Sequence, residues 1–157
     1  MHSGPLADLY SEALLNHATS PRNRGALPGC TASAIGENPT CGDRVCLRMR
    51  INADGIVEDA RWEGEGCAIS KAAASLVTTL IRGKPAADAL GIARAASRAI
   101  AEGDMDALRA LGGEVACLAG VARFPGRVKC ATMAWHAAAE ALGDAPGAPP
   151  TITGPAA

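Results

Sequence analysis

The hydrophobic pattern changes its period part-way along the chain, and this change limits the folds that the chain can adopt. Residues 44–51 alternate between apolar and polar side chains, which is typical of a strand with one buried face. A turn at residues 52–55 and a return segment at residues 56–63 predict an antiparallel hairpin. With residues 32–37 as a short edge strand, we expect a three-stranded antiparallel sheet.

Beyond residue 63, the apolar side chains recur at helical spacing. Across residues 69–81 they follow the positions i, i+3, i+4 and i+7, and Gly83 ends that helix. The predicted helices span residues 5–17, 69–81, 85–102, 104–112 and 129–142. The expected fold class is therefore α+β, with a small three-stranded antiparallel sheet packed against about five helices.

Length and composition indicate one domain. The chain has 157 residues, of which 48% are hydrophobic, and this is enough for a single core. We assign residues 1–143 to that domain and residues 144–157, which are rich in Pro, Gly and Ala, to a flexible tail.

Charge and hydropathy argue against two classes of partner. The 15 basic and 16 acidic residues give a net charge of −1, and no basic run is present, so we expect no nucleic-acid partner. No segment approaches the ~20 apolar residues of a membrane span, so we expect no membrane association. The first residues show no export signal, which favours a cytoplasmic location.

The chain contains six cysteines. Since it is too long to need disulfide staples and shows no export signal, we expect these thiols to be reduced. Reduced thiols serve as buried side chains, as metal ligands or as nucleophiles. The six residues are Cys30, Cys41, Cys46, Cys67, Cys117 and Cys130.

Three of these thiols fall at predicted junctions between elements. Cys41 lies between the first two strands, and Cys67 and Cys130 lie at helix starts, where partial positive charge stabilises a thiolate. Asp43 adds a carboxylate beside Cys41. Three thiolates and one carboxylate complete a tetrahedral set for Zn²⁺. Because no C-x-x-C pair is present, the spacing alone leaves both a metal site and buried structural thiols open.

Three segments carry a resemblance to a known family. They are Asn-Pro-Thr-Cys-Gly-Asp at residues 38–43, Gly-Glu-Gly-Cys-Ala-Ile-Ser at residues 64–70 and Arg-Val-Lys-Cys-Ala-Thr at residues 127–132. They resemble the signatures of the NifU/IscU-like iron–sulfur cluster assembly family. Lys129, where the IscU type has a histidine, and the long stretch of residues 68–129 between two cysteines are similar to its SufU type.

The resemblance implies a cofactor, an activity and partners. Proteins of the SufU type bind zinc and accept persulfide sulfur from a PLP-dependent cysteine desulfurase of the SufS type, acting as sulfur carriers or sulfurtransferases. Downstream iron–sulfur assembly proteins then receive the sulfur. The implied catalytic residues are Cys41, which takes up the sulfur, and Arg127, which acts in the reaction with the desulfurase. The implied zinc ligands are Cys41, Asp43, Cys67 and Cys130.

Two other functions stay open. The same ligands could hold an iron–sulfur cluster on a scaffold that passes it to apo-proteins, or the site could be a purely structural zinc centre. Lys129 argues against the scaffold, because an IscU-type scaffold carries an imidazole there. Asp43 argues against a structural centre, because structural zinc sites favour closed Cys/His sets.

The other conspicuous side chains match no signature. We expect them to pack in the core or lie at the surface instead of binding a metal. They are Cys30, Cys46, Cys117, His17, His136, Trp62 and Trp135.

Overall fold

A three-stranded antiparallel sheet forms one layer of the molecule. The computed structural model describes residues 11–40 and 42–143. Its strands β1 (Ala32–Asn38), β2 (Asp43–Ile51) and β3 (Val57–Glu65) are arranged in the order β1-β2-β3. Leu47 in the central strand lies opposite Ala34 of β1 and Trp62 of β3. The predicted sheet and its edge strand are confirmed.

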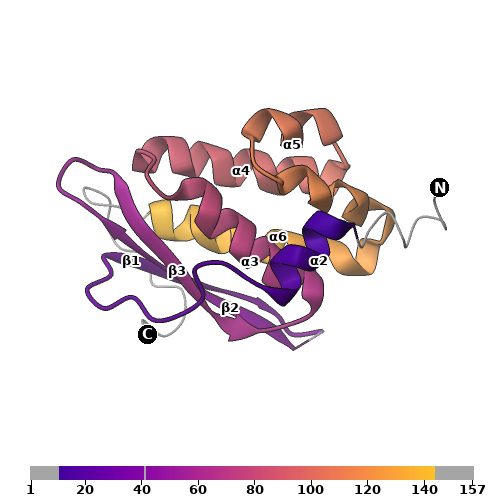
Figure 1. The fold of residues 1–157 in the computed structure, drawn as a ribbon, viewed down its shortest axis with the longest axis horizontal. Coiled ribbons are helices and arrows are strands. Elements are labelled where there is room, and N and C mark those ends of the chain that lie inside the picture. The colour runs from indigo at the N-terminus through magenta and orange to yellow at the C-terminus, as the bar shows by residue number, and fades with distance from the viewer. Residues whose placement is uncertain (1–10, 41, 144–157) are drawn as a thin grey trace.

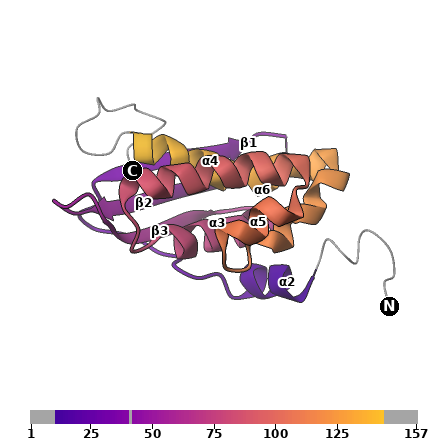
Figure 2. The same ribbon diagram turned by 90° about the horizontal axis from the view of Figure 1, so that it is seen from above.

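Helices cover one face of this sheet. In the described part of the chain they are α2 (Glu12–Thr19), α3 (Ala68–Ile81), α4 (Ala86–Glu102), α5 (Met105–Leu111), the 3-10 helix η1 (Val115–Arg123) and α6 (Pro125–Gly143). The helices α3 and α6 pack on the sheet, and α4 packs on α6 from the far side (Figures 1 and 2). The predicted α+β class is confirmed, although η1 was not predicted.

The core lies between the sheet and the helices α3 and α6. Trp62 from β3 and Trp135 from α6 are both completely buried, as predicted. The alternation in β2 holds as well, because every second side chain points into the core. These inward residues of β2, all at most 4% exposed, are Val45, Leu47, Met49 and Ile51.

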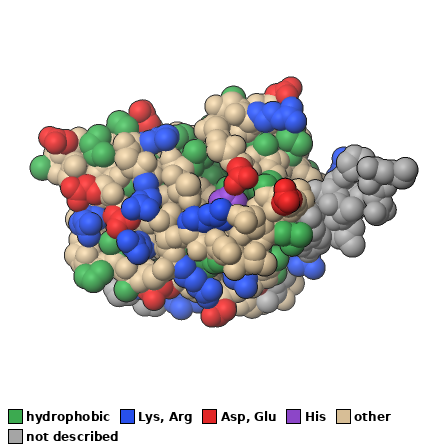
Figure 3. Space-filling model, viewed as in Figure 1, with side chains coloured by type: hydrophobic (Ala, Val, Ile, Leu, Met, Phe, Trp, Pro, Cys, Tyr) green, Lys and Arg blue, Asp and Glu red, His purple; other side chains and the backbone are tan. Residues whose placement is uncertain are grey.

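The opposite face of the sheet is charged, which is usual where an antiparallel sheet faces water on one side. Arginine and glutamate side chains pair across its strands. These pairs are Arg44–Glu37, Arg48–Glu63 and Arg50–Glu58. Basic and acidic side chains are also intermixed over the face shown in Figure 3. Among the described residues, no helix has both the length and the apolar character needed to span a bilayer.

The last helix begins earlier than predicted. It starts at Pro125 instead of residue 129, because the fixed φ and missing N–H of proline suit a first helical turn. The Arg127 amide donates to the Phe124 carbonyl at 2.7 Å within that turn. Cys130 therefore lies in the second turn, which corrects the expectation that it lies at the helix start.

The prediction of one continuous helix over residues 5–17 is wrong at Ser11, which is extended (φ −62°, ψ 165°) and not helical. The Ser11 side chain accepts a hydrogen bond from the Leu14 amide at 3.3 Å and caps α2, which begins at Glu12. The predicted start at Pro5 lies outside the described residues. So does the tail at residues 144–157, and its separation from the domain remains a prediction.

Candidate metal centre

Three side chains from distant elements meet at one end of the sheet. Asp43 is the first residue of β2, Cys67 is the N-cap of α3, and Cys130 lies in α6. One ligand atom from each side chain lies within 4.8 Å of the others. Asp43 is 5% exposed and Cys130 is fully buried, whereas Cys67 is partly exposed. This group can hold a metal ion.

The hairpin between β1 and β2 places Asp43. Asn38 at the end of β1 lies directly opposite Asp43 at the start of β2. The Gly42 amide donates to the Asn38 carbonyl at 2.9 Å and helps to close the turn. Cys41 belongs to this turn in the sequence but lies outside the described residues, so its predicted role is taken up below as a proposal.

Two glycines allow β3 to approach Asp43 before the chain enters α3. Gly64 has a φ of +148°, and a Cβ there would lie 2.0 Å from the Arg44 carbonyl oxygen. A Cβ at Gly66 would lie 3.1 Å from Asp43 Cγ. Cys67 follows immediately as the N-cap of α3.

The packing of α6 on β1 brings Cys130 to the group. A Cβ at Gly36 of β1 would lie 2.7 Å from the Met133 carbonyl oxygen, so the two backbones are nearly in contact there. The Asn38 Nδ2 atom donates to Cys130 Sγ at 3.7 Å. Asn38 lies within a recognised motif, but it was not predicted to contact the site.

Ser70 is a second residue that sequence reasoning missed. Its hydroxyl donates to Asp43 Oδ2 at 2.5 Å and lies 3.4 Å from Cys67 Sγ. The signals in the sequence were its place at the end of the motif at residues 64–70 and its position three residues after Cys67.

The electrostatics of the group suit a cation. Burial, together with the neighbouring Cys67 and Asp43, raises the pKa of the Cys130 thiol to about 12. Three acidic groups therefore lie together with little access to water. A divalent cation stabilises thiolates and carboxylates in such a place, and sulfur with oxygen is a donor set that Zn²⁺ accepts.

Comparison with known proteins agrees with this geometry. Residues 9–146 match the NifU-like N-terminal domain. The chain belongs to this family. The resemblance to NifU/IscU-like proteins is thereby confirmed.

Relatives of this NifU-like domain carry two kinds of name. A protein of Bacillus subtilis named "Zinc-dependent sulfurtransferase SufU" is 42% identical over 132 residues, which cover 84% of this chain and 88% of that protein. A Streptococcus pyogenes protein named "Iron-sulfur cluster assembly scaffold protein IscU" is 39% identical over 137 residues, covering 87% and 84%. A Fervidobacterium islandicum structure, described as a putative iron–sulfur cluster assembly scaffold protein for the SUF system, superposes with a TM-score of 0.75 at 28% identity, covering 85% of this chain and 96% of that one.

Two basic residues of this NifU-like domain flank the site on α6. Arg127 lies one helical turn before Cys130, and Lys129 directly precedes it. Both residues are exposed.

The remaining described cysteines lie outside the group. Cys46 is on the outer face of β2, and burial raises the pKa of its thiol. Cys117 lies in η1, where burial and then Glu114 raise the pKa of its thiol to about 12. Cys30 precedes β1. That Cys30, Cys46 and Cys117 do not bind the metal remains a prediction.

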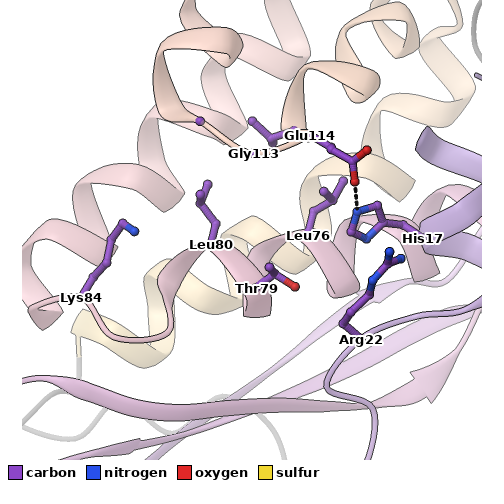
Figure 4. Close-up of a pocket in the computed structure, with 10 residues that line it drawn as sticks. His17, Arg22, Leu76, Thr79, Leu80, Lys84, Gly113 and Glu114 are labelled. Atoms are coloured by element: carbon purple, nitrogen blue, oxygen red, sulfur yellow. Dashed lines mark hydrogen bonds and ion pairs between the residues drawn. The ribbon is translucent and has the colours of Figure 1, made fainter. Parts of the chain in front are cut away.

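A separate cavity of about 290 Å³ lies between α3 and the segment that precedes η1 (Figure 4). His17 at its edge lies 2.7 Å from Ser75 Oγ and 2.9 Å from Glu114 Oε1. This row resembles a nucleophile, a base and an acid, but Ser75 is fully buried and its Oγ also accepts from the Arg22 amide. The row therefore joins three elements, and His17 is a packed residue, as predicted. His136 is exposed.

Proposed function

We propose that this NifU-like domain is an iron–sulfur cluster assembly protein that binds zinc and carries sulfur. Its ligands are Cys41, Asp43, Cys67 and Cys130, and Cys41 accepts persulfide sulfur from a PLP-dependent cysteine desulfurase. The observation that carries the proposal is the convergence of one carboxylate and two thiols from β2, α3 and α6 within 4.8 Å. The name of the Bacillus subtilis relative supports the choice of zinc and of sulfur transfer.

Cys41 is the natural fourth ligand, because it is two residues from Asp43 in a turn whose ends pair across the hairpin. When bound, zinc keeps the ligand thiols deprotonated at neutral pH. Buried contacts hold Asp43 and Cys130 in place. The resemblance to the SufU type assigns the acceptor role to Cys41, although Cys67 is partly exposed.

The chemical step is an exchange at sulfur. The Cys41 thiolate attacks the outer sulfur of the donor's persulfide and forms a new S–S bond. The S–S bond of the donor breaks, and the donor cysteine leaves as a thiolate. Atoms and electrons balance without an external oxidant. Arg127, exposed on the first turn of α6, stabilises the anionic complex with the desulfurase.

A specific observation also supports a second function, a scaffold on which an iron–sulfur cluster is built. The same residues could ligate iron, and the Streptococcus pyogenes relative is named as a scaffold. Against it stands Lys129, which is exposed and cannot replace an imidazole beside Cys130. Sulfur transfer is thus the function that this site supports better.

Transfer can be measured as the mass gain of one sulfur after incubation with a cysteine desulfurase and free cysteine. The wild-type protein is expected to be colourless, to contain about one zinc per chain, and to gain sulfur on Cys41. Cys41→Ala should gain none. Arg127→Ala should gain it more slowly while keeping its zinc, and Cys46→Ser serves as the matched control with wild-type behaviour.

The scaffold would give a different result. A brown protein with stoichiometric iron and sulfide, which it passes to an apo-protein, would replace the sulfur-carrier proposal. A colourless zinc protein that gains no sulfur on Cys41 would contradict both functions.

A further inference from the structure

Ser70 stands between two candidate ligands that come from different elements. Its hydroxyl donates to Asp43 Oδ2 at 2.5 Å and lies 3.4 Å from Cys67 Sγ. The side chain is fully buried, so water does not compete for these contacts. Asp43 belongs to β2 and Cys67 caps α3, and this hydroxyl is therefore a link between the sheet and the helix at the metal centre.

The backbone around Ser70 is built for this contact. Ser70 lies in the first turn of α3, three residues after Cys67, and therefore faces the same side as its N-cap. A Cβ at Gly66 would lie 3.0 Å from Ser70 Cβ and 3.1 Å from Asp43 Cγ. The absence of a side chain at Gly66 is what lets the serine and the carboxylate come together.

The chemistry of a carboxylate gives this contact a consequence. A hydroxyl that donates to Oδ2 fixes the plane of the Asp43 carboxylate and leaves Oδ1 available to a cation. Groups that hydrogen-bond a metal ligand orient it, and their loss commonly lowers metal affinity 10–100-fold. Asp43 is the ligand most in need of such support, because a carboxylate is a weaker partner than thiolate for a soft cation.

We infer that Ser70 is a positioning residue that holds Asp43 as a metal ligand and thereby sets the affinity of the mixed sulfur and oxygen site. This inference rests on the proposed metal site and extends it to a residue outside the ligand set. Without Ser70, the three thiols remain but the Asp43 carboxylate loses the hydrogen bond that fixes its plane. The site then binds a divalent cation more weakly and with a different ligand field.

The test compares two identical substitutions on the same helix, Ser70→Ala and Ser75→Ala. Both serines are fully buried and both are hydrogen-bonded, but Ser75 contacts His17 and the Arg22 amide, away from the ligands. The affinity for Co²⁺ and Zn²⁺ is measured by competition with a chelator. The visible spectrum of the Co²⁺ protein reports the ligand field, and thermal melts of the metal-free proteins report stability.

Ser70→Ala is expected to lower the affinity for both cations about 10–100-fold and to shift the visible Co²⁺ bands. The thiolate-to-metal charge-transfer bands should remain, because all the thiols are still present. Ser75→Ala is expected to bind both cations as the wild-type protein does. In an Asp43→Ala background, Ser70→Ala should change the affinity little further, because its effect passes through the carboxylate.

Equal affinities for Ser70→Ala and the wild-type protein would overturn the inference, and so would equal losses in Ser70→Ala and Ser75→Ala. If Ser70→Ala does not fold, Ser70→Thr, which keeps the hydroxyl, must retain the wild-type Co²⁺ spectrum. A changed spectrum in that variant would overturn the inference as well. A wild-type protein that binds neither cation would overturn the metal site itself, which separates this failure from that of Ser70 alone.

Discussion

Close contact at single glycines decides how the ligand-bearing elements meet. At Gly36, β1 and α6 approach until a Cβ would lie 2.7 Å from the Met133 carbonyl oxygen. Met133 lies one turn beyond Cys130, so any shift of α6 at this point moves a candidate ligand. Gly36 therefore affects the metal site indirectly, because it allows the close approach of α6 that positions Cys130.

Gly36→Ala should therefore destabilise the protein by about 1–3 kcal/mol, which is typical of overpacking, and weaken metal binding. Gly91→Ala is the matched control, because Gly91 is an exposed residue in α4 with no atom within 4 Å of an added Cβ. That control should stabilise the protein by about 0.5–1 kcal/mol. Chemical denaturation measures both, and the expectation fails if Gly36→Ala is as stable as the wild-type protein.

Burial also decides which thiols react. Because burial raises the pKa of Cys117 from 9.0 to about 12, its thiolate is roughly a thousandfold scarcer at pH 8 than that of an ordinary thiol. Iodoacetamide should therefore modify Cys117 slowly in the folded protein and rapidly in urea, as peptide mapping would show. A raised pKa also means that the stability gained by the neutral thiol is present below pH 9 and declines towards pH 12. Rapid labelling of Cys117 in the folded protein at pH 8 would contradict the raised pKa of its thiol.

At the scale of elements, a buried row of polar side chains joins α2, α3 and the start of η1. Ser75 contributes the buried end and Glu114, whose side chain is 55% exposed, contributes the outer end. His17 lies between them. Since Ser75 and Glu114 differ in exposure, the loss of a hydrogen bond at each should change the free energy of unfolding by different amounts.

Ser75→Ala should lower the free energy of unfolding by about 1–3 kcal/mol, because it leaves the buried His17 Nδ1 and Arg22 amide without their partner. Glu114→Gln should change it by less than about 1 kcal/mol, since water reaches that position. Urea denaturation of the two variants provides the measurement. If Glu114→Gln lowered the free energy of unfolding more than Ser75→Ala does, the assignment of Ser75 as the buried end would be wrong.

At the scale of the whole molecule, the metal site ties the sheet to two helices. The described ligands lie in β2, at the start of α3 and in α6, and these elements also form the core. Metal binding and folding should therefore be coupled, because the site exists only when the sheet and both helices are packed.

Removal of the metal by a chelator should lower the melting temperature. A cation present at 100 times its Kd adds about 2.7 kcal/mol, which corresponds to a shift of roughly 5–10 °C for a chain of this size. Cys67→Ser should show the same loss without chelator, whereas Cys46→Ser should keep the metal-dependent shift. Calorimetry together with metal analysis measures these changes. A melting temperature that is the same with and without chelator would contradict the coupling of metal binding to folding.

Local patterns in the sequence predicted the strands, most of the helices and the chemical types at the site. Alternation in β2 and helical spacing in α3 are local patterns, because side-chain direction follows directly from the backbone period. Glycine, proline and aspartate marked most boundaries for the same local reason, as with the stop at Gly83 and the cap at Asp104. The motifs supplied the candidate ligands through resemblance to a family.

Only the tertiary structure decided how these residues meet. Ser70 and Asp43 are 27 residues apart and Asn38 and Cys130 are 92 apart, so no local pattern records their contacts. The early start of α6 was missed for a different reason: the small and polar residues after Pro125 show no apolar period that would mark a helix. The candidate ligands converge because of the way the helices lie on the sheet. That arrangement depends on the apolar surface buried by all the elements of the core together. No single segment of the sequence therefore reveals it.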